Sequence, residues 1–271
     1  MAEPSRSPRA AEDWSAAQYL KFEDERTRPS RDLLAQVPLD APRRVVDLGC
    51  GPGNSTELLV ARFPGAEVIG VDSSPDMLRQ ARERLSRRKF VEADLSTWTP
   101  EPGTDLLFGN AVFHWVPDHP NVLKRLLHAL GPGGVLAVQM PDNANQPAFT
   151  ALDKVVASGS WAAAIAQTKG RQRKQLLAPE GYYDLFRPLC SRIDVWHIHY
   201  NHLMESHADV VEWFKGSGLR PLLAPLDPAT RAAFLAKYTE EISRAYPLRC
   251  DGKVMVRFPR LFIVAVRGDG G

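Results

Sequence analysis

The 271-residue sequence predicts an α/β fold in which helices cover a doubly wound, mostly parallel sheet. Between Arg44 and Met140, short apolar runs alternate with segments of helical periodicity, which is typical of such a sheet. The first run leads into a glycine-rich turn and a helical pattern, an arrangement that places a ligand at a helix N-terminus. Several runs also end in a polar residue, as expected where the carboxyl edge of a sheet binds a ligand.

The expected elements follow the chain in order. A helical segment covers Trp14 to Gln36, and Pro29 is expected to open a second helix at Ser30. Seven strands are expected, in the run from Arg44 to Asp47 and at Val68–Asp72, Lys89–Glu92, Asp105–Asn110, Val135–Met140, Ile193–Tyr200 and Val254–Val266. Further helices are expected at Asn54–Arg62, Pro75–Leu85, Asn121–Leu130, Pro147–Ser158, Pro179–Leu185, Ala208–Lys215 and Pro228–Ala245.

The length suits one large domain, which we expect to cover residues 13–267 between disordered tails at 1–12 and 268–271. The regular alternation breaks at about 142–190, which indicates a helical insertion. Within it, the basic segment Lys169–Lys174 is interpreted either as a lid that meets an anionic substrate or as a mobile surface loop.

Composition narrows the class of partner. A formal net charge of +2 gives no general reason for binding nucleic acid or a membrane surface, so any attraction for an anion has to be local. No apolar run is long enough to span a bilayer, and the N-terminus lacks the apolar core of a signal peptide. Three widely spaced cysteines argue against a disulfide framework. We expect a soluble, cytoplasmic monomer.

The glycine-rich turn indicates the ligand. Asp47, Gly49, Gly51 and Gly53 stand at alternate positions, and glycines there let the backbone adopt positive φ and let a ligand approach closely. No Lys follows the last glycine, which excludes a phosphate-binding P-loop, and the spacing is not that of a dinucleotide fingerprint. A carboxylate at Asp47 would repel a pyrophosphate but suits a ligand with ammonium or sulfonium charge, as in S-adenosylmethionine.

A second acid, Asp72, ends the next expected strand, where a carboxylate can bind ribose hydroxyls. Ser73 follows it at the same edge of the sheet. The alternative for both acids is structural, with Asp47 and Asp72 capping the helices that follow them. We favour the ligand role, because a glycine loop with two acids in register is a stronger signal than the loop alone.

These motifs resemble class I S-adenosylmethionine-dependent methyltransferases, and within them a family that methylates trans-aconitate. The resemblance covers about Asp13 to Arg267. Besides the glycine loop, it rests on Trp14, Tyr19–Phe22, Arg26–Pro29, Asn110–Ala111, His114–His119, Val138–Asn143 and Phe258–Val264. It implies a seven-stranded Rossmann-like methyltransferase sheet, S-adenosylmethionine as cofactor and a tricarboxylate as substrate.

The resemblance also implies roles for single residues. Asp94 would accept a hydrogen bond from the adenine amino group, and Leu95 and Met77 would pack on the ring. Asn110 is expected at the site from topology, because it ends the fourth strand at the edge where the strand ends converge. Core packing is the alternative for Met77. On the substrate side, the resemblance implies Tyr19, Arg28, His114, Trp115 and Arg260. A core role stays open for Trp115, and a structural ion pair stays open for Arg260.

Methylation of a carboxylate needs no general base, because the nucleophile is already ionised above its pKa of about 4. We therefore assign no catalytic residue. Although His197 and His199 share a strand face, no Cys or carboxylate joins them at ligand spacing, and we expect no metal. The rival functions are methylation of another small acid, a phenol or an acyl-carrier-bound acid; a non-catalytic S-adenosylmethionine-binding regulator; and, disfavoured by Asp47 and Gly53, a nicotinamide-dependent oxidoreductase.

Overall fold

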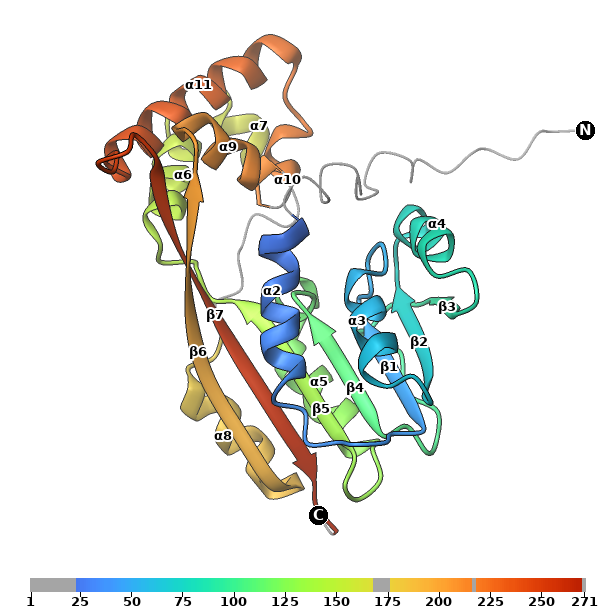
Figure 1. The fold of residues 1–271 in the computed structure, drawn as a ribbon. Coiled ribbons are helices and arrows are strands. Elements are labelled where there is room, and N and C mark those ends of the chain that lie inside the picture. The colour runs from blue at the N-terminus through green and yellow to red at the C-terminus, as the bar shows by residue number, and fades with distance from the viewer. Residues whose placement is uncertain (1–22, 168–175, 216–217, 270–271) are drawn as a thin grey trace, which may run out of the picture. The chain divides into compact units, whose positions relative to one another are not determined.

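A computed structural model describes residues 23–167, 176–215 and 218–269 (Figure 1). Seven strands form one sheet in the order β3-β2-β1-β4-β5-β7-β6. This confirms the expected seven-stranded α/β fold. The strands are β1 (Arg44–Leu48), β2 (Glu67–Asp72), β3 (Lys89–Glu92), β4 (Leu106–Asn110), β5 (Val135–Pro141), β6 (Cys190–Met204) and β7 (Val254–Arg267).

The central strands are parallel. Residue Val45 of β1 is in register with Val68 of β2 on one side and with Leu106 of β4 on the other. The pairs β2–β3 and β4–β5 are also parallel. In contrast, β7 runs opposite to β5, because Gly133 N–H donates to Arg267 O near the start of β5 while Asp142 N–H, just past its end, donates to Pro259 O. The sheet is therefore mixed, and its parallel part ends at β5.

Two of the described helices begin at a side-chain cap. Ser74 caps α4 by accepting from Met77 N–H, Asp227 caps α11 by accepting from Ala229 N–H, and Pro occupies the first turn of both. The α-helices are α2 (Glu23–Leu34), α3 (Asn54–Arg62), α4 (Pro75–Arg84), α5 (His119–His128), α6 (Pro147–Ala157), α7 (Ala162–Ala166), α8 (Pro179–Phe186), α9 (His207–Lys215), α10 (Arg220–Leu223) and α11 (Pro228–Ala245), with 3-10 turns at Phe113–Trp115 and Arg187–Leu189.

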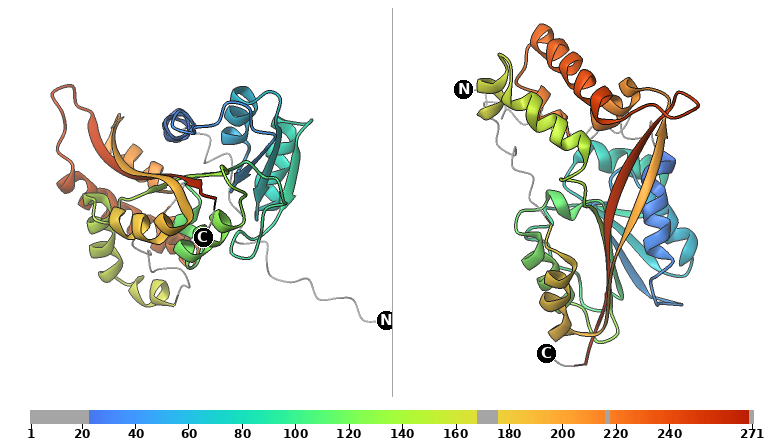
Figure 2. Two further views of the ribbon diagram at one scale, coloured as in Figure 1. Left: turned by 90° about the horizontal axis from the view of Figure 1, so that it is seen from below. Right: turned by 90° about the vertical axis from the view of Figure 1, so that its left-hand side faces the viewer.

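Two compact units make up the described chain. The first runs up to Gln139 and includes Tyr183–Asp194 and the residues from Ile263 onward. In it, α2 and α3 lie on one face of the parallel strands and α5 lies on the other (Figures 1 and 2). Its core is made of fully buried strand residues such as Val45, Leu107 and Phe108, because strands covered on both faces are apolar throughout.

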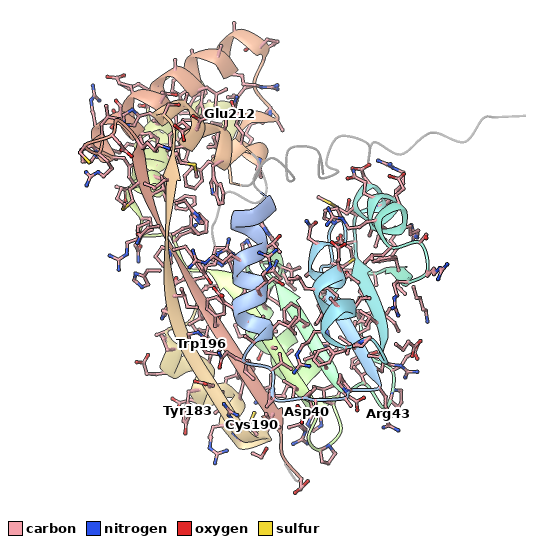
Figure 3. All side chains as sticks on the ribbon, viewed as in Figure 1. Asp40, Arg43, Tyr183, Cys190, Trp196 and Glu212 are labelled. Atoms are coloured by element: carbon pink, nitrogen blue, oxygen red, sulfur yellow. The ribbon has the colours of Figure 1, made fainter. Side chains whose placement is uncertain are left out.

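The second unit comprises Met140–Tyr182 and Val195–Phe262. Its helix α11 contacts α6 and α9, and Tyr238 and Tyr246 each bond the backbone of Ala148 in α6. Trp196 of β6 stacks on Phe262 of β7, with ring centroids 5.2 Å apart (Figure 3). No helix in the described ranges is both long enough and apolar enough to cross a membrane.

Several boundaries differ from those expected. Pro29 lies inside α2 instead of opening a new helix, so the carbonyl of Glu25 lacks its usual i+4 donor. Strand β6 is longer than the expected Ile193–Tyr200, because it continues on both sides of that segment in residues that form no apolar run and are partly exposed. Helices α7 and α10 were not expected at all; both are too short to show a helical period. The segment Lys169–Lys174 lies outside the described residues. The expected domain bounds stay a prediction.

Candidate functional site

The glycine-rich turn follows β1 directly and bends sharply. The N–H groups of Gly49 and Cys50 both donate to Val71 O of β2, at 2.7 and 3.0 Å, and Gly53 N–H donates back to Cys50 O at 3.0 Å. Gly49, Gly51 and Gly53 have φ of +66°, +54° and +92°, a region that side chains disfavour. The three alternate glycines thus form the predicted turn at the start of α3.

Gly49 also has no room for a side chain. A Cβ there would lie 2.3 Å from Cγ2 of Val112, which follows β4. A Cβ at Gly51 would meet no atom within 4 Å, so this glycine faces open space. The turn therefore packs tightly against the segment after β4 at Gly49 and leaves room for a ligand at Gly51.

Asp47 is completely buried beneath this turn. Its Oδ2 accepts hydrogen bonds from Ser55 Oγ at 2.8 Å and Thr56 Oγ1 at 2.6 Å, both in the first turn of α3. Its Oδ1 has no hydrogen-bond partner among the described residues. Burial raises the pKa of Asp47 from 3.8 to about 7, although the two hydroxyl bonds work in the opposite direction. Asp47 thus holds the first turn of α3 through Oδ2, while Oδ1 remains a buried acceptor that can bind a ligand donor.

Asp72 joins the turn to the next helix. Its Oδ2 accepts from Gly51 N–H and its Oδ1 from Ser74 N–H, both at 2.9 Å. Each carboxylate oxygen can accept more than one hydrogen bond. Ser73 between them is exposed, whereas Met77 is 5% exposed and belongs to the buried face of α4.

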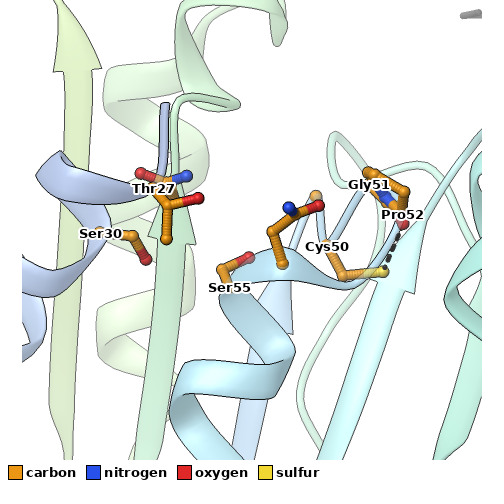
Figure 4. Close-up of a pocket in the computed structure, with 9 residues that line it drawn as sticks. Thr27, Ser30, Cys50, Gly51, Pro52 and Ser55 are labelled. Carbon is orange, nitrogen blue, oxygen red and sulfur yellow. Dashed lines mark hydrogen bonds between the residues drawn. The ribbon is translucent and has the colours of Figure 1, made fainter. Parts of the chain in front are cut away.

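A pocket opens beside the turn (Figure 4). It is lined by Thr27 and Ser30 of α2, by Gly49, Cys50, Gly51, Pro52, Asn54 and Ser55 of the turn and α3, and by Asn110 at the end of β4. The structure therefore brings three of the predicted residues, Gly49, Gly51 and Asn110, to one cavity. Asp47, Gly53 and Asp72 are not among its lining residues, but each is hydrogen-bonded to one of them, namely Ser55, Cys50 and Gly51 respectively.

Ser30 is a pocket residue that the sequence did not reveal, whereas Thr27 belongs to the Arg26–Pro29 motif on which the resemblance rests. In Figure 4 both lie across from the glycine turn. Ser30 is 1% exposed, and its Oγ has no hydrogen-bond partner among the described residues. The sequence signal for a pocket-facing helix was the pair of hydroxyl residues Thr27 and Ser30, which lie three apart on one helix face. Such pairs are also common on helices that bind no ligand.

The segment after β3 does not line the pocket. Leu95 is buried, and Asp94 Oδ1 accepts from Ser96 N–H at 2.8 Å in a tight turn. Arg125 of α5 fixes this turn by donating to three carbonyls, those of Leu95, Ser96 and Trp98. The adenine-binding roles of Asp94 and Leu95 stay predictions.

The segment after β4 carries the predicted methyl-side wall. His114 and Trp115 lie in a 3-10 turn with ring centroids 4.8 Å apart. Trp115 is 48% exposed, which excludes the core role considered from sequence. Just before them, Ala111 has φ of +57°, a conformation uncommon outside glycine.

The remaining predicted substrate residues, Arg28, Arg260 and Tyr19, lie in different parts of the chain. Arg28 is an exposed residue of α2, next to the pocket residue Thr27. Arg260 belongs to β7 in the second unit, where it is 4% exposed with its guanidinium carbon 5.1 Å from the Phe258 ring centroid. Tyr19 lies outside the described residues.

Comparison with known proteins decides the family. The chain is 59% identical to a trans-aconitate 2-methyltransferase of Rhodopseudomonas palustris (strain HaA2) over 94% of this chain and 99% of that protein. The chain belongs to the trans-aconitate 2-methyltransferase family. A relative of the same name from Methylobacterium radiotolerans is 55% identical over 93% of this chain and 98% of its own length. A methyltransferase domain model matches residues 45–134, which span the glycine turn and β1 to β4.

Solved structures agree on the fold. YcgJ of Bacillus subtilis matches with a TM-score of 0.57 and 16% identity, over 90% of this chain and all of that one. The phosphoethanolamine N-methyltransferase 2 of Haemonchus contortus, solved with S-adenosylhomocysteine, matches with a TM-score of 0.54 and 18% identity, over 89% of this chain and 52% of that one. The expected class I methyltransferase fold is thus confirmed.

The pocket of this trans-aconitate 2-methyltransferase family member suits an amino-acid-bearing cofactor. An ammonium group needs acceptors, and Asp47 Oδ1 is a buried acceptor that no described group occupies. A nucleoside needs close approach to a backbone without side chains, which Gly51 provides. The acceptor of Asp47 and the open backbone at Gly51 therefore fit S-adenosylmethionine.

Proposed function

We propose that the chain transfers the methyl group of S-adenosylmethionine to a carboxylate of trans-aconitate, giving the methyl monoester and S-adenosylhomocysteine. It is proposed to do so as a cytoplasmic monomer acting on a small dissolved acid, without nucleic acid or membrane. The observation that carries the proposal is the pocket between α2, the glycine turn and Asn110, in a chain 59% identical to a protein of that name.

The chemistry asks for orientation rather than proton transfer. A carboxylate is ionised at neutral pH, and the bound cofactor supplies an electrophilic methyl group on a sulfonium. Holding acceptor oxygen and methyl in line within a dry site can supply roughly 7–11 kcal/mol of the barrier. The chain's task is to exclude water and fix both partners. The exposed ring of Trp115 and the partly buried ring of His114 are proposed to form the wall on the methyl side.

The carboxylates that are not methylated need fixed cationic partners, for which arginine is best suited. We propose Arg28 and Arg260 for this role, with Tyr19 as a hydroxyl donor. We likewise propose that Asp72 and Ser73 bind the ribose and that Met77, Asp94 and Leu95 bind the adenine. The contacts of Asp72 and the sequence resemblance support these roles.

The test is S-adenosylhomocysteine formation by purified protein with a panel of di- and tricarboxylates that includes both aconitate isomers and citrate. We expect the highest kcat/KM with trans-aconitate. A higher kcat/KM with another acid would transfer the proposal to that acid. No product with any acid, while the cofactor still binds, would identify a non-catalytic binding protein instead.

Arginine variants test the substrate contacts. Replacing Arg28 with Gln should raise KM for trans-aconitate about tenfold or more while leaving the cofactor Kd unchanged, because a charged hydrogen bond contributes roughly 1.5–3 kcal/mol. Arg31→Gln is the matched control, since Arg31 is an exposed residue of the same helix outside every motif. An equal effect of the two variants would show that Arg28 acts through general charge alone.

A further inference from the structure

The ends of β4 and β5 carry two paired carboxamides. Register places Asn110 directly opposite Gln139 in the parallel ladder, so their side chains project from the same face of the sheet. Gln139 is fully buried, and its Nε2 donates a hydrogen bond to Asn110 Oδ1. Asn110 lines the pocket, whereas Gln139 does not. Gln139 therefore acts on the pocket through Asn110.

Gln139 also holds the backbone beside Asn110. Ala111 has φ of +57°, a left-handed conformation that is strained for a residue with a Cβ. Its N–H donates to Gln139 O at 3.0 Å, which fixes the chain in this turn. One residue of β5 thus sets both the main-chain direction and the side-chain orientation at the end of β4. A strained turn held from behind in this way is typical of functional sites.

The orientation has a chemical consequence. A carboxamide is planar, with an acceptor oxygen on one side and two N–H donors on the other. Because Gln139 engages the oxygen of Asn110, the donors are left for other partners. A donor suits an oxygen acceptor such as a carboxylate and not an ammonium group, which would itself need an acceptor.

We propose that Gln139 is a positioning residue that locks the Asn110 carboxamide, so that its NH2 group binds a carboxylate in the pocket. The inference rests on the proposed function for its choice of ligands. Two carboxylates meet there, that of the cofactor's methionyl group and that of the acid to be methylated. Recognition of either one makes the site selective for acids over amines.

The decisive variant is Gln139→Glu, which has almost the same shape. A protonated Glu can still donate to Asn110 Oδ1, but an ionised Glu can only accept, which makes Asn110 turn and present its oxygen to the pocket. Binding of the carboxylate should therefore match the wild type at low pH and weaken about tenfold or more as the pH rises. Gln139→Met, which removes the lock at similar size, should weaken binding by a constant factor at all pH values.

Two readouts identify the carboxylate. Calorimetric binding of S-adenosylhomocysteine reports the methionyl carboxylate and needs no acid substrate, whereas KM for trans-aconitate reports the acid. A pH-dependent loss in either readout supports the lock and names its ligand. Equal losses in Glu and Met variants at every pH, or no loss in either readout, would overturn it. If wild-type protein methylates no acid, the proposed function fails while the calorimetric readout still tests Gln139.

Discussion

Replacing Asp47 with Asn should make the ligand-free protein more stable at alkaline pH. The Asp47 carboxyl is fully buried, and its pKa rises from 3.8 to about 7 because burial disfavours the charged form. The folded state therefore holds a proton that the unfolded state loses, and stability falls as the pH rises between those two values. About three pKa units correspond to roughly 4 kcal/mol. The Asn variant carries no such titration.

Urea unfolding followed by circular dichroism, from pH 4 to pH 8, measures the effect. The unfolding free energies of the two proteins should be similar near pH 4, and the variant should exceed the wild type by up to about 4 kcal/mol at pH 8. The other ionisable groups are common to both proteins and cancel in the difference. A difference that stays constant across this range, or that favours the wild type as pH rises, would refute the assignment of the raised pKa to Asp47.

Three further predictions concern the supports of the site. Gly49→Ala should abolish cofactor binding and lower stability by more than about 1 kcal/mol, because its Cβ would meet Val112 at positive φ; calorimetry and thermal unfolding test this. Tyr246→Phe should lower the free energy of unfolding by about 1–3 kcal/mol, because the buried N–H of Ala148 in α6 donates to the Tyr246 hydroxyl and would lose its acceptor. Urea unfolding measures this, and an unchanged midpoint would contradict it. Arg125→Met should speed amide exchange in the 95–98 turn, whose carbonyls Arg125 binds, whereas unchanged exchange would show that the turn is rigid alone.

The parallel half of the sheet was predictable because its signals are local. Buried strands such as β1 and β4 are continuous apolar runs, and glycines or prolines mark the turns between them. Strand β6 was predicted only in part, since its ends are partly exposed and lack an apolar run. Pro29 misled the helix prediction, because tertiary packing holds α2 together across a residue that normally ends a helix.

The site residues also divide into those that local signals predict and those that depend on tertiary structure. Gly49 and Gly51 were predicted from the spacing of the glycines in the turn, and Asn110 was predicted because strand ends in parallel sheets converge at one edge. The pairing of Gln139 with Asn110 depends on strand register, and the approach of Ser30 to the glycine turn depends on how α2 packs. Neither fact is encoded in the spacing of residues near each other in the chain.

The glycine turn also determines how the protein meets oxidants. Cys50 lies within the turn and is buried, and burial with nearby carboxylates raises the pKa of its thiol well above the usual value. A protonated thiol is a poor nucleophile, so peroxide and alkylating reagents should spare the turn. Cys190 is buried as well, which leaves Cys250 as the exposed thiol of the three. A maleimide dye should therefore attach at residue 250 alone and give a singly labelled, active enzyme.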